Sequence, residues 1–174
     1  MRESIDAPRM TDSPSADRSR VIQWQDPASL AAIATELGGV AALHAMIAQN
    51  LQAPVSHLLD FELVHAEVGK VRFACRTHES QYNPMGTVHG GVISTWLDSA
   101  LGAAVYSALG KGSSYTTAQL NVHFVRPLLI GVEGLFAEGE VVRMGRQLAT
   151  SQGRVVDGQG RLYAHGSATC LIFS

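Results

Sequence analysis

The chain is poor in the features that mark several large classes of protein. Its 174 residues include two cysteines, 6% aromatic residues and 16% charged residues, and the formal net charge is −2. No block or stripe of basic residues is present, so the electrostatic footprint that nucleic-acid binding requires is missing. Polar or glycine residues interrupt every apolar run before it could span a bilayer. We therefore expect no nucleic acid and no membrane as partner.

The scarce cysteines and the polar N-terminal stretch bear on the compartment. Cys75 and Cys170 lie far apart, each in an apolar, strand-like segment, which predicts buried thiols in a reducing environment. Residues 1–20 contain no apolar run of the kind a signal peptide needs. These patterns predict a cytoplasmic protein.

The length favours one domain with a substantial core. Residues 1–26 are polar and lack periodicity, so we expect a disordered or loosely docked tail there. Residues 27–174 should form a single domain. Within it, residues 27–60 carry helical spacing interrupted by Gly38-Gly39, which predicts short N-terminal helices that form an extension.

The rest of the chain is predicted to form two strands, one long helix and four further strands. Tight Gly-containing turns separate most of the strand segments, which favours antiparallel hairpins. This order predicts an α+β fold in which one antiparallel sheet curls around a single central helix. The expected strands are 61–67, 70–77, 114–125, 132–144, 147–156 and 162–173, and the expected helix is 90–109.

The predicted central helix carries one residue that is charged at neutral pH, Asp98. Apolar or small residues occupy every face of this helix, as expected for a helix that a sheet surrounds. A carboxylate in such surroundings costs free energy unless it is paired, and burial favours its protonated form, which suits general-base chemistry. The alternative is a structural carboxylate that bonds backbone amides or an arginine such as Arg126.

Residues 83–91 lead polar residues and glycines directly into the start of this helix. A helix start exposes unpaired amides at a positive dipole end. With no side chain at Gly90, a substrate carbonyl could approach the backbone and accept a hydrogen bond in an oxyanion hole. Asn83 and His89 could supply further donors. The alternative is a tight turn that needs glycines and a capping side chain.

The spacing of Gly90 and Asp98 has a consequence for assembly. Eight residues of helix separate them by roughly 12 Å along the axis. One copy cannot bring both to the same carbonyl. If both act on one acyl group, Gly90 of one copy must meet Asp98 of a second copy across a two-fold interface.

These residues resemble the hotdog-fold acyl-CoA thioesterases, in particular the branch that includes phenylacetyl-CoA thioesterase. The resemblance covers about 61–173. It is carried by the Asn-x-x-Gly-x-x-His-Gly-Gly motif at 83–91, with an acid nine positions after the histidine. The segments 121–127, 145–146 and 164–169 support it.

The resemblance implies roles for the matching residues. Asp98 would be the nucleophile or the general base, and Gly90 the oxyanion donor with His89 and Asn83 in support. Thr117 would position the acid or the water, a role that neighbouring Thr116 could also fill. Gly91 of the motif is expected beside the substrate. The arginines Arg126, Arg143 and Arg146 are candidate contacts for the coenzyme A phosphates.

The resemblance also implies a homodimer, assembling further to a homotetramer, that hydrolyses acyl-CoA without a cofactor. No metal is expected, because the histidines lack metal-ligand spacing. A non-catalytic acyl-CoA-binding module and a hydroxyacyl-thioester dehydratase are the alternatives on the same fold. Trp96, Tyr106 and Phe124 could line an acyl pocket, although core is the better assignment for each. The acyl group itself stays open.

Overall fold

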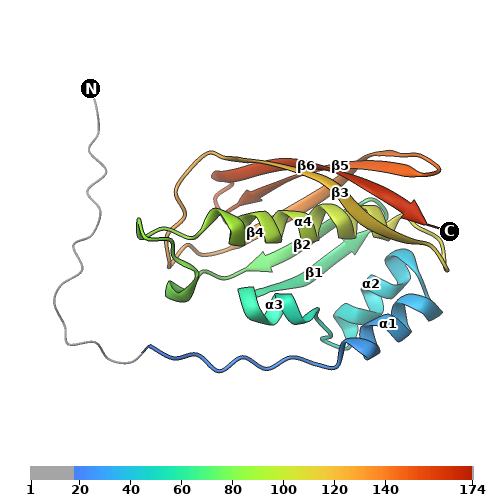
Figure 1. The fold of residues 1–174 in the computed structure, drawn as a ribbon, viewed down its shortest axis with the longest axis horizontal. Coiled ribbons are helices and arrows are strands. Elements are labelled where there is room, and N and C mark those ends of the chain that lie inside the picture. The colour runs from blue at the N-terminus through green and yellow to red at the C-terminus, as the bar shows by residue number, and fades with distance from the viewer. Residues whose placement is uncertain (1–17, 174) are drawn as a thin grey trace.

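A computed structural model describes residues 18–173 and has the predicted order of elements. Six antiparallel strands form one sheet, and one long helix lies against it (Figure 1). The helices are α1 (Pro27–Glu36), α2 (Gly39–Ala48), α3 (Pro54–Leu59) and α4 (Gly90–Ser107), with a short 3₁₀ helix η1 (Glu79–Gln81). The strands are β1 (Phe61–Glu67), β2 (Lys70–Cys75), β3 (Ser114–Phe124), β4 (Leu135–Met144), β5 (Leu148–Val156) and β6 (Leu162–Phe173).

The element boundaries match the sequence predictions closely, with one clear difference. β4 begins at Leu135, three residues later than predicted. Gly131 and Gly134 have φ values of 83° and 62°, so the chain turns here and cannot extend as a strand. The α+β prediction of a sheet around one central helix is confirmed.

The sheet order is β1-β2-β4-β5-β6-β3, which leaves β1 and β3 as the two edges. A cross-strand row of glycines, Gly139, Gly153 and Gly166, lies in the middle of the sheet. A Cβ at position 139 would lie 2.2 Å from the carbonyl oxygen of Ala100 in α4. The missing side chains therefore let α4 approach the sheet closely.

The core lies between α4 and the inner face of the sheet. Trp96, Leu97, Leu101 and Val105 of α4 have no solvent exposure and pack with strand residues such as Val155. Burying a side chain of this size contributes about 1.5–3 kcal/mol. The core fixes both the depth and the rotation of α4, and hence the direction in which its one charged side chain points.

The helices α1 and α2 pack at the C-terminal end of α4. The α1–α2 turn at Gly38 and Gly39 has φ values of 67° and 52°, and a Cβ at either position would collide with the backbone at Lys111 or Leu109. The segment 18–26 forms neither helix nor strand, and Arg20 forms an ion pair with Asp60. The predicted tail otherwise falls on residues 1–17, which lie outside the described residues. Within residues 18–173 no helix combines the length and apolarity needed to cross a bilayer.

Candidate active site on the central helix

Asp98 lies in the middle of α4 and is the only charged residue of that helix. Its neighbours Leu97, Ala100 and Leu101 have no solvent exposure, whereas Asp98 itself is half-buried. Its Oδ1 is shielded from solvent and has no hydrogen-bond partner among residues 18–173. The ion pair with Arg126 that the sequence left open does not form within the described chain. The carboxylate thus keeps a free acceptor in a low-dielectric setting.

Two side chains of the sheet, Tyr115 and Cys170, lie close enough to Asp98 for its charge to raise their pKa values. Burial raises the pKa of Tyr115, and the charges of Cys170 and Asp98 add to that effect. Burial also raises the pKa of the Cys170 thiol, against a hydrogen bond with Thr117 that lowers it, while Asp98 raises it further. Both groups therefore stay neutral near pH 7. Thr117 and Cys170 are direct cross-strand partners in β3 and β6, which brings the predicted Thr117 into the surroundings of Asp98.

A β-bulge next to Thr117 decides which residues of β3 face the helix. The pairing of β3 with β6 shifts by one residue between Thr117 and Gln119. Tyr115 and Thr117 are half-buried before the bulge, and Leu120 and Val122 are half-buried after it. The extra residue thus returns the strand to the same face. Thr116 is exposed and points away, so Thr117 is the threonine that faces α4.

Two aromatic residues of β3 contact α4 on opposite sides of Asp98. A Cβ at Gly90 would lie 3.0 Å from Cζ of Phe124, and a Cβ at Gly102 would lie 2.5 Å from Oη of Tyr115. The Phe124 side chain is 55% exposed, so its assignment as a core residue is wrong. An aromatic residue on an edge strand has no second layer to cover it within one copy.

The backbone at the start of α4 has one amide without an acceptor. His89 is the N-cap, and its Nδ1 accepts a hydrogen bond of 2.9 Å from the amide of Gly91. The amide of Val92 donates to the carbonyl of His89. No acceptor for the Gly90 amide occurs among residues 18–173. This amide is therefore free to donate to an oxyanion, while His89 and Gly91 are occupied with each other through the cap.

Asn83 uses its side chain to hold the loop that precedes α4. Its Nδ2 donates to Oγ1 of Thr87 at 2.9 Å, and its Oδ1 accepts from the amides of Met85 and Thr87. The backbone of the same loop bonds Val88 to the carbonyl of Leu128. In one copy, Asn83 thus shapes the loop that presents Gly90.

The structure separates the three candidate arginines. Arg126 is exposed, lies over the ring of Tyr163 and follows Phe124, so it is near the start of α4. Arg143 and Arg146 lie at the β4–β5 hairpin, near the far end of β6. Arg126 lies near the start of β6 and the β4–β5 hairpin lies near its end, and about nine residues of strand separate the two by roughly 30 Å. One copy therefore does not place all three arginines around a single phosphate group.

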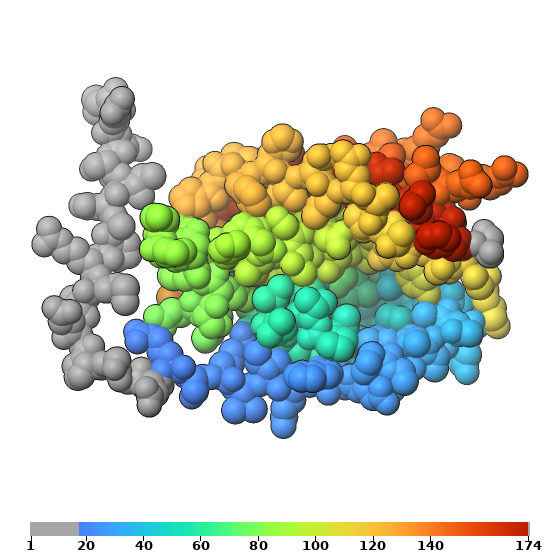
Figure 2. All heavy atoms as spheres, in the orientation of Figure 1, coloured from blue at the N-terminus to red at the C-terminus, as the bar shows by residue number. Residues whose placement is uncertain are grey.

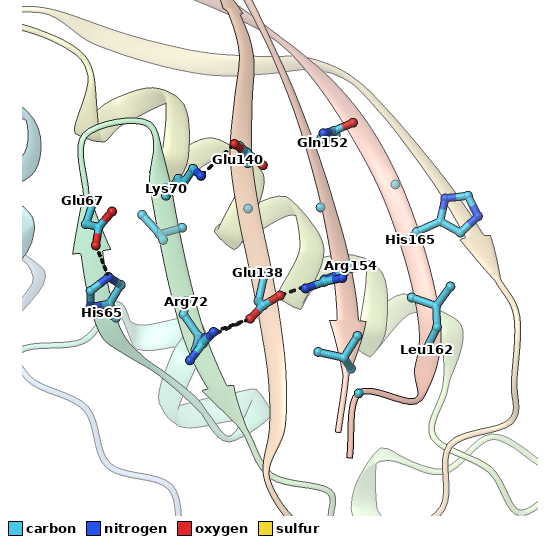
Figure 3. A pocket seen from close by; sticks show the side chains of 16 residues that line it. His65, Glu67, Lys70, Arg72, Glu138, Glu140, Gln152, Arg154, Leu162 and His165 are labelled. Carbon is cyan, nitrogen blue, oxygen red and sulfur yellow. Dashed lines mark hydrogen bonds and ion pairs between the residues drawn. The ribbon is translucent and has the colours of Figure 1, made fainter. Parts of the chain in front are cut away.

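A cavity of about 740 Å³ lies on the outer face of the sheet, and Asp98 does not line it. Figure 3 shows that charged side chains of neighbouring strands, together with uncharged ones such as Gln152 and Leu162, line it. Glu138 pairs with Arg72 and Arg154, and Lys70 pairs with Glu140. Burial would raise the pKa of Glu138, but these two arginines lower it overall. The carboxylates of Glu138 and Glu140 are thus each paired with a basic side chain.

The described residues contain no cluster of three or more His, Cys, Asp or Glu that could hold a metal. His123 and His165, to which the sequence assigned no role, are cross-strand neighbours with stacked rings 4.9 Å apart. Trp96 is fully buried, as predicted, and its Nε1 donates to the carbonyl of Leu59.

Sequence reasoning missed Tyr115 and Cys170 as neighbours of Asp98. The signal available was weak. Period-two alternation places residue 115 on the same strand face as Thr117, but it does not show that this face meets the helix. The pairing of Thr117 with Cys170 depends on the strand register, which a single sequence does not reveal.

Comparison with known proteins bears on the family of the chain. The family model described as "Thioesterase superfamily" matches residues 85–164. The human protein named acyl-coenzyme A thioesterase 13 is 30% identical over 108 residues, which cover 62% of this chain and 76% of that protein. A protein of Halobacterium salinarum named as an esterase is 36% identical over 96 residues, or 52% of this chain, and the match spans only 62% of its length.

A solved structure supports the same assignment. It is a thioesterase-type protein from Ralstonia eutropha JMP134, described as related to phenylacetic acid degradation. It superposes with a TM-score of 0.66 at 26% identity and covers 74% of this chain and 98% of its own. The hotdog fold expected from the motif is therefore confirmed. From the matched segment, the human relative and the shared fold, this chain belongs to the thioesterase superfamily.

Proposed function

We propose that this protein hydrolyses acyl-CoA thioesters, with Asp98 as general base. The observation that carries the proposal is the shielded, unpartnered Oδ1 of Asp98 in the middle of an otherwise uncharged helix. A buried carboxylate oxygen without a hydrogen-bond partner is rare in native proteins, and where one occurs the group often has a catalytic or binding role. Acyl-CoA as the substrate rests on the name of the human relative and on the sequence motif.

The chemistry needs only groups of the chain and one water. Asp98 accepts a proton as the water oxygen attacks the thioester carbonyl carbon. The Gly90 amide donates to the oxyanion of the tetrahedral intermediate. The intermediate then expels coenzyme A as its thiolate, which takes up the proton, and the free acid remains. In this proposal Thr117 positions Asp98 or the water.

A second copy is needed to complete this site. Gly90 and Asp98 lie eight residues apart on one helix, roughly 12 Å along its axis. The β3 edge has no strand neighbour on one side within the described chain, and α4 reaches the surface beside it as a green band in Figure 2. An unpaired edge strand with exposed Phe124 is a surface that proteins usually cover. We propose that two copies form a dimer through this surface, so that the Gly90 amide of each copy faces Asp98 of the other. Dimers then assemble into a homotetramer.

Arg126 is the best-placed contact for the coenzyme A phosphates. It lies at the same end of the molecule as the free Gly90 amide and has no carboxylate partner among the described residues. Arg143 and Arg146 could reach the same ligand only from another copy. A planar guanidinium suits phosphate recognition. The free, buried cysteines agree with the cytoplasmic location expected from the sequence.

Hydrolysis fits the site better than the two alternatives. A dehydratase needs a histidine paired with an acid, and no histidine among residues 18–173 hydrogen-bonds Asp98. A purely binding module would gain stability by pairing or replacing the carboxylate. The unpaired state of Asp98 favours a catalytic role over both.

The direct test follows thiol release from acyl-CoA substrates with a thiol-reactive dye. We expect the wild type to turn over at least one acyl-CoA, and Asp98→Asn to lower kcat by about 10²- to 10⁴-fold. The matched control is Asp26→Asn, the same change at the N-cap of α1, where both residues cap well. The proposal is wrong if the wild type binds acyl-CoA and releases no thiol, or if Asp98→Asn keeps full activity.

A further inference from the structure

The face of α4 that carries Asp98 is polar and half-exposed before that residue and buried after it. One turn before it lie Ser94 and Thr95, which are polar and half-exposed. One turn after it lie Leu101 and Gly102, which are buried. An apolar acyl group held at Asp98 therefore gains more by extending toward the C-terminal end of α4. The charged coenzyme A portion stays toward the exposed start of the helix.

Tyr115 lies in the path from Asp98 toward the C-terminal end of α4. Its hydroxyl packs on Gly102 so closely that a Cβ there would lie 2.5 Å from Oη and 2.7 Å from Cε2. The residue is half-buried, and burial raises the pKa of its hydroxyl, which is neutral near pH 7. This hydroxyl forms no hydrogen bond with the residues that the structure describes. The ring thus occupies the space over the helix one turn beyond the carboxylate.

The N-terminal helix α1 contacts this ring indirectly, through Tyr106. Tyr106 packs against Tyr115 with ring centroids 6.2 Å apart, and its hydroxyl donates to the carbonyl of Ala34 in α1 at 3.4 Å. The turn between α1 and α2 fits against the backbone of Leu109 and Lys111 without room for a side chain. A connected path therefore runs from the N-terminal extension through Tyr106 and Tyr115 to the vicinity of Asp98.

We propose that Tyr115 is the specificity-determining residue of the thioesterase site and that the N-terminal extension fixes it in place. The acyl group lies between Asp98 and Tyr115 and ends at the tyrosine ring. This inference rests on the hydrolysis proposed above and names its substrate class, thioesters of short or compact acyl groups.

The distance along the helix sets the expected size. Asp98 and Gly102 are four residues apart, a rise of about 6 Å. An extended alkyl chain covers that distance with roughly four or five methylene groups. Butyryl and hexanoyl groups, or a single aromatic ring, fit before Tyr115, whereas octanoyl and longer chains run into it.

The experiment measures kcat/KM of the full-length protein for acetyl-, butyryl-, hexanoyl-, octanoyl-, dodecanoyl- and phenylacetyl-CoA. We expect the wild type to fall off beyond hexanoyl. Tyr115→Ala should raise the octanoyl-to-butyryl ratio by about 10-fold or more, because removing the ring extends the apolar space. Tyr115→Leu, which keeps more of the packing, should raise it less and serves if the alanine variant fails to fold. The matched control is Phe136→Ala, which removes a half-buried ring beneath Arg72 on the outer face.

Each outcome decides between the two proposals. A wild type that hydrolyses none of these substrates overturns the proposed function. A wild type that is active and prefers dodecanoyl-CoA overturns the role of Tyr115 alone. The same holds if folded Tyr115→Ala and Tyr115→Leu keep the wild-type ratio, or if Phe136→Ala shifts the ratio equally.

Discussion

Tyr115 and Gly102 fit together as a pair, with the tyrosine hydroxyl in the space that any larger residue at position 102 would fill. A glycine inside a helix normally costs about 1 kcal/mol relative to alanine. The helix accepts that cost where the ring of an edge strand packs on its backbone. The pair links the strand to the helix one turn after Asp98.

The coupling of this pair gives the first prediction. Gly102→Ala should lower the free energy of unfolding, because the new Cβ overlaps Tyr115 and overpacking costs about 1–3 kcal/mol. In the Tyr115→Ala background the same change should raise the free energy of unfolding by about 1 kcal/mol, through helix propensity. Urea denaturation of the four proteins of this cycle measures both values. Equal effects in the two backgrounds would show that the residues do not interact.

Asp98→Asn should separate stability from activity. The amide keeps the shape of the carboxylate and removes a charge whose Oδ1 has no partner. We expect the free energy of unfolding to rise by about 1 kcal/mol while thiol release falls. Thermal denaturation and the thiol assay on the same samples check this. A large loss of stability would indicate that the carboxylate has a structural partner, contrary to the proposal.

Mixing two inactive variants tests the shared site. Gly90→Pro removes the free amide at the first helical position, which proline tolerates, and His89 has the extended ψ of 135° that a residue before proline prefers. If each site combines Gly90 of one copy with Asp98 of the other, unfolding and refolding Gly90→Pro together with Asp98→Asn restores one intact site per mixed dimer. Random pairing then gives about a quarter of wild-type activity.

The control for that experiment is Gly90→Ala, which adds bulk beside Phe124 and keeps the amide proton. It should lose less activity than Gly90→Pro. No recovery on mixing, with dimers present by light scattering, would place both groups within one copy.

The N-cap of α4 gives a stability prediction. His89→Ala removes the acceptor for the Gly91 amide and should lower the free energy of unfolding by about 1 kcal/mol. Asparagine is a favourable N-cap, so His89→Asn should restore most of that loss. Thermal denaturation checks the order of the three proteins. A catalytic contribution from the remaining ring nitrogen would appear as a lower kcat of His89→Asn at wild-type Tm.

Asp157, at the β5–β6 turn, gives a pH prediction. Burial would raise its pKa, but hydrogen bonds from Arg161, Gln159 and Tyr163 lower it from 3.8 to about 2. A pKa that is lower in the folded state adds stability above the unfolded value, and that stability is lost as the pH falls toward the folded value. The difference in unfolding free energy between wild type and Asp157→Asn should therefore be full at pH 6 and shrink between pH 4 and 2. A difference that stays constant over this range contradicts the assignment.

The sequence by itself determined the order of elements, the central helix and the identity of its one acid. Local signals suffice for these features. The glycines of 86–91 mark the helix start, the apolar residues around Asp98 mark a buried helix, and period-two alternation marks the strands. The distance between Gly90 and Asp98 follows from helix geometry alone.

Only the tertiary structure decided what surrounds Asp98. The register of β3 against β6, shifted by one bulge, brings Thr117 and Cys170 together and turns Tyr115 toward Gly102. The same packing places Arg126 over the ring of Tyr163. Such contacts join residues far apart in the chain, and a shift of one residue in register reverses which side chains face the helix, so no local pattern encodes them.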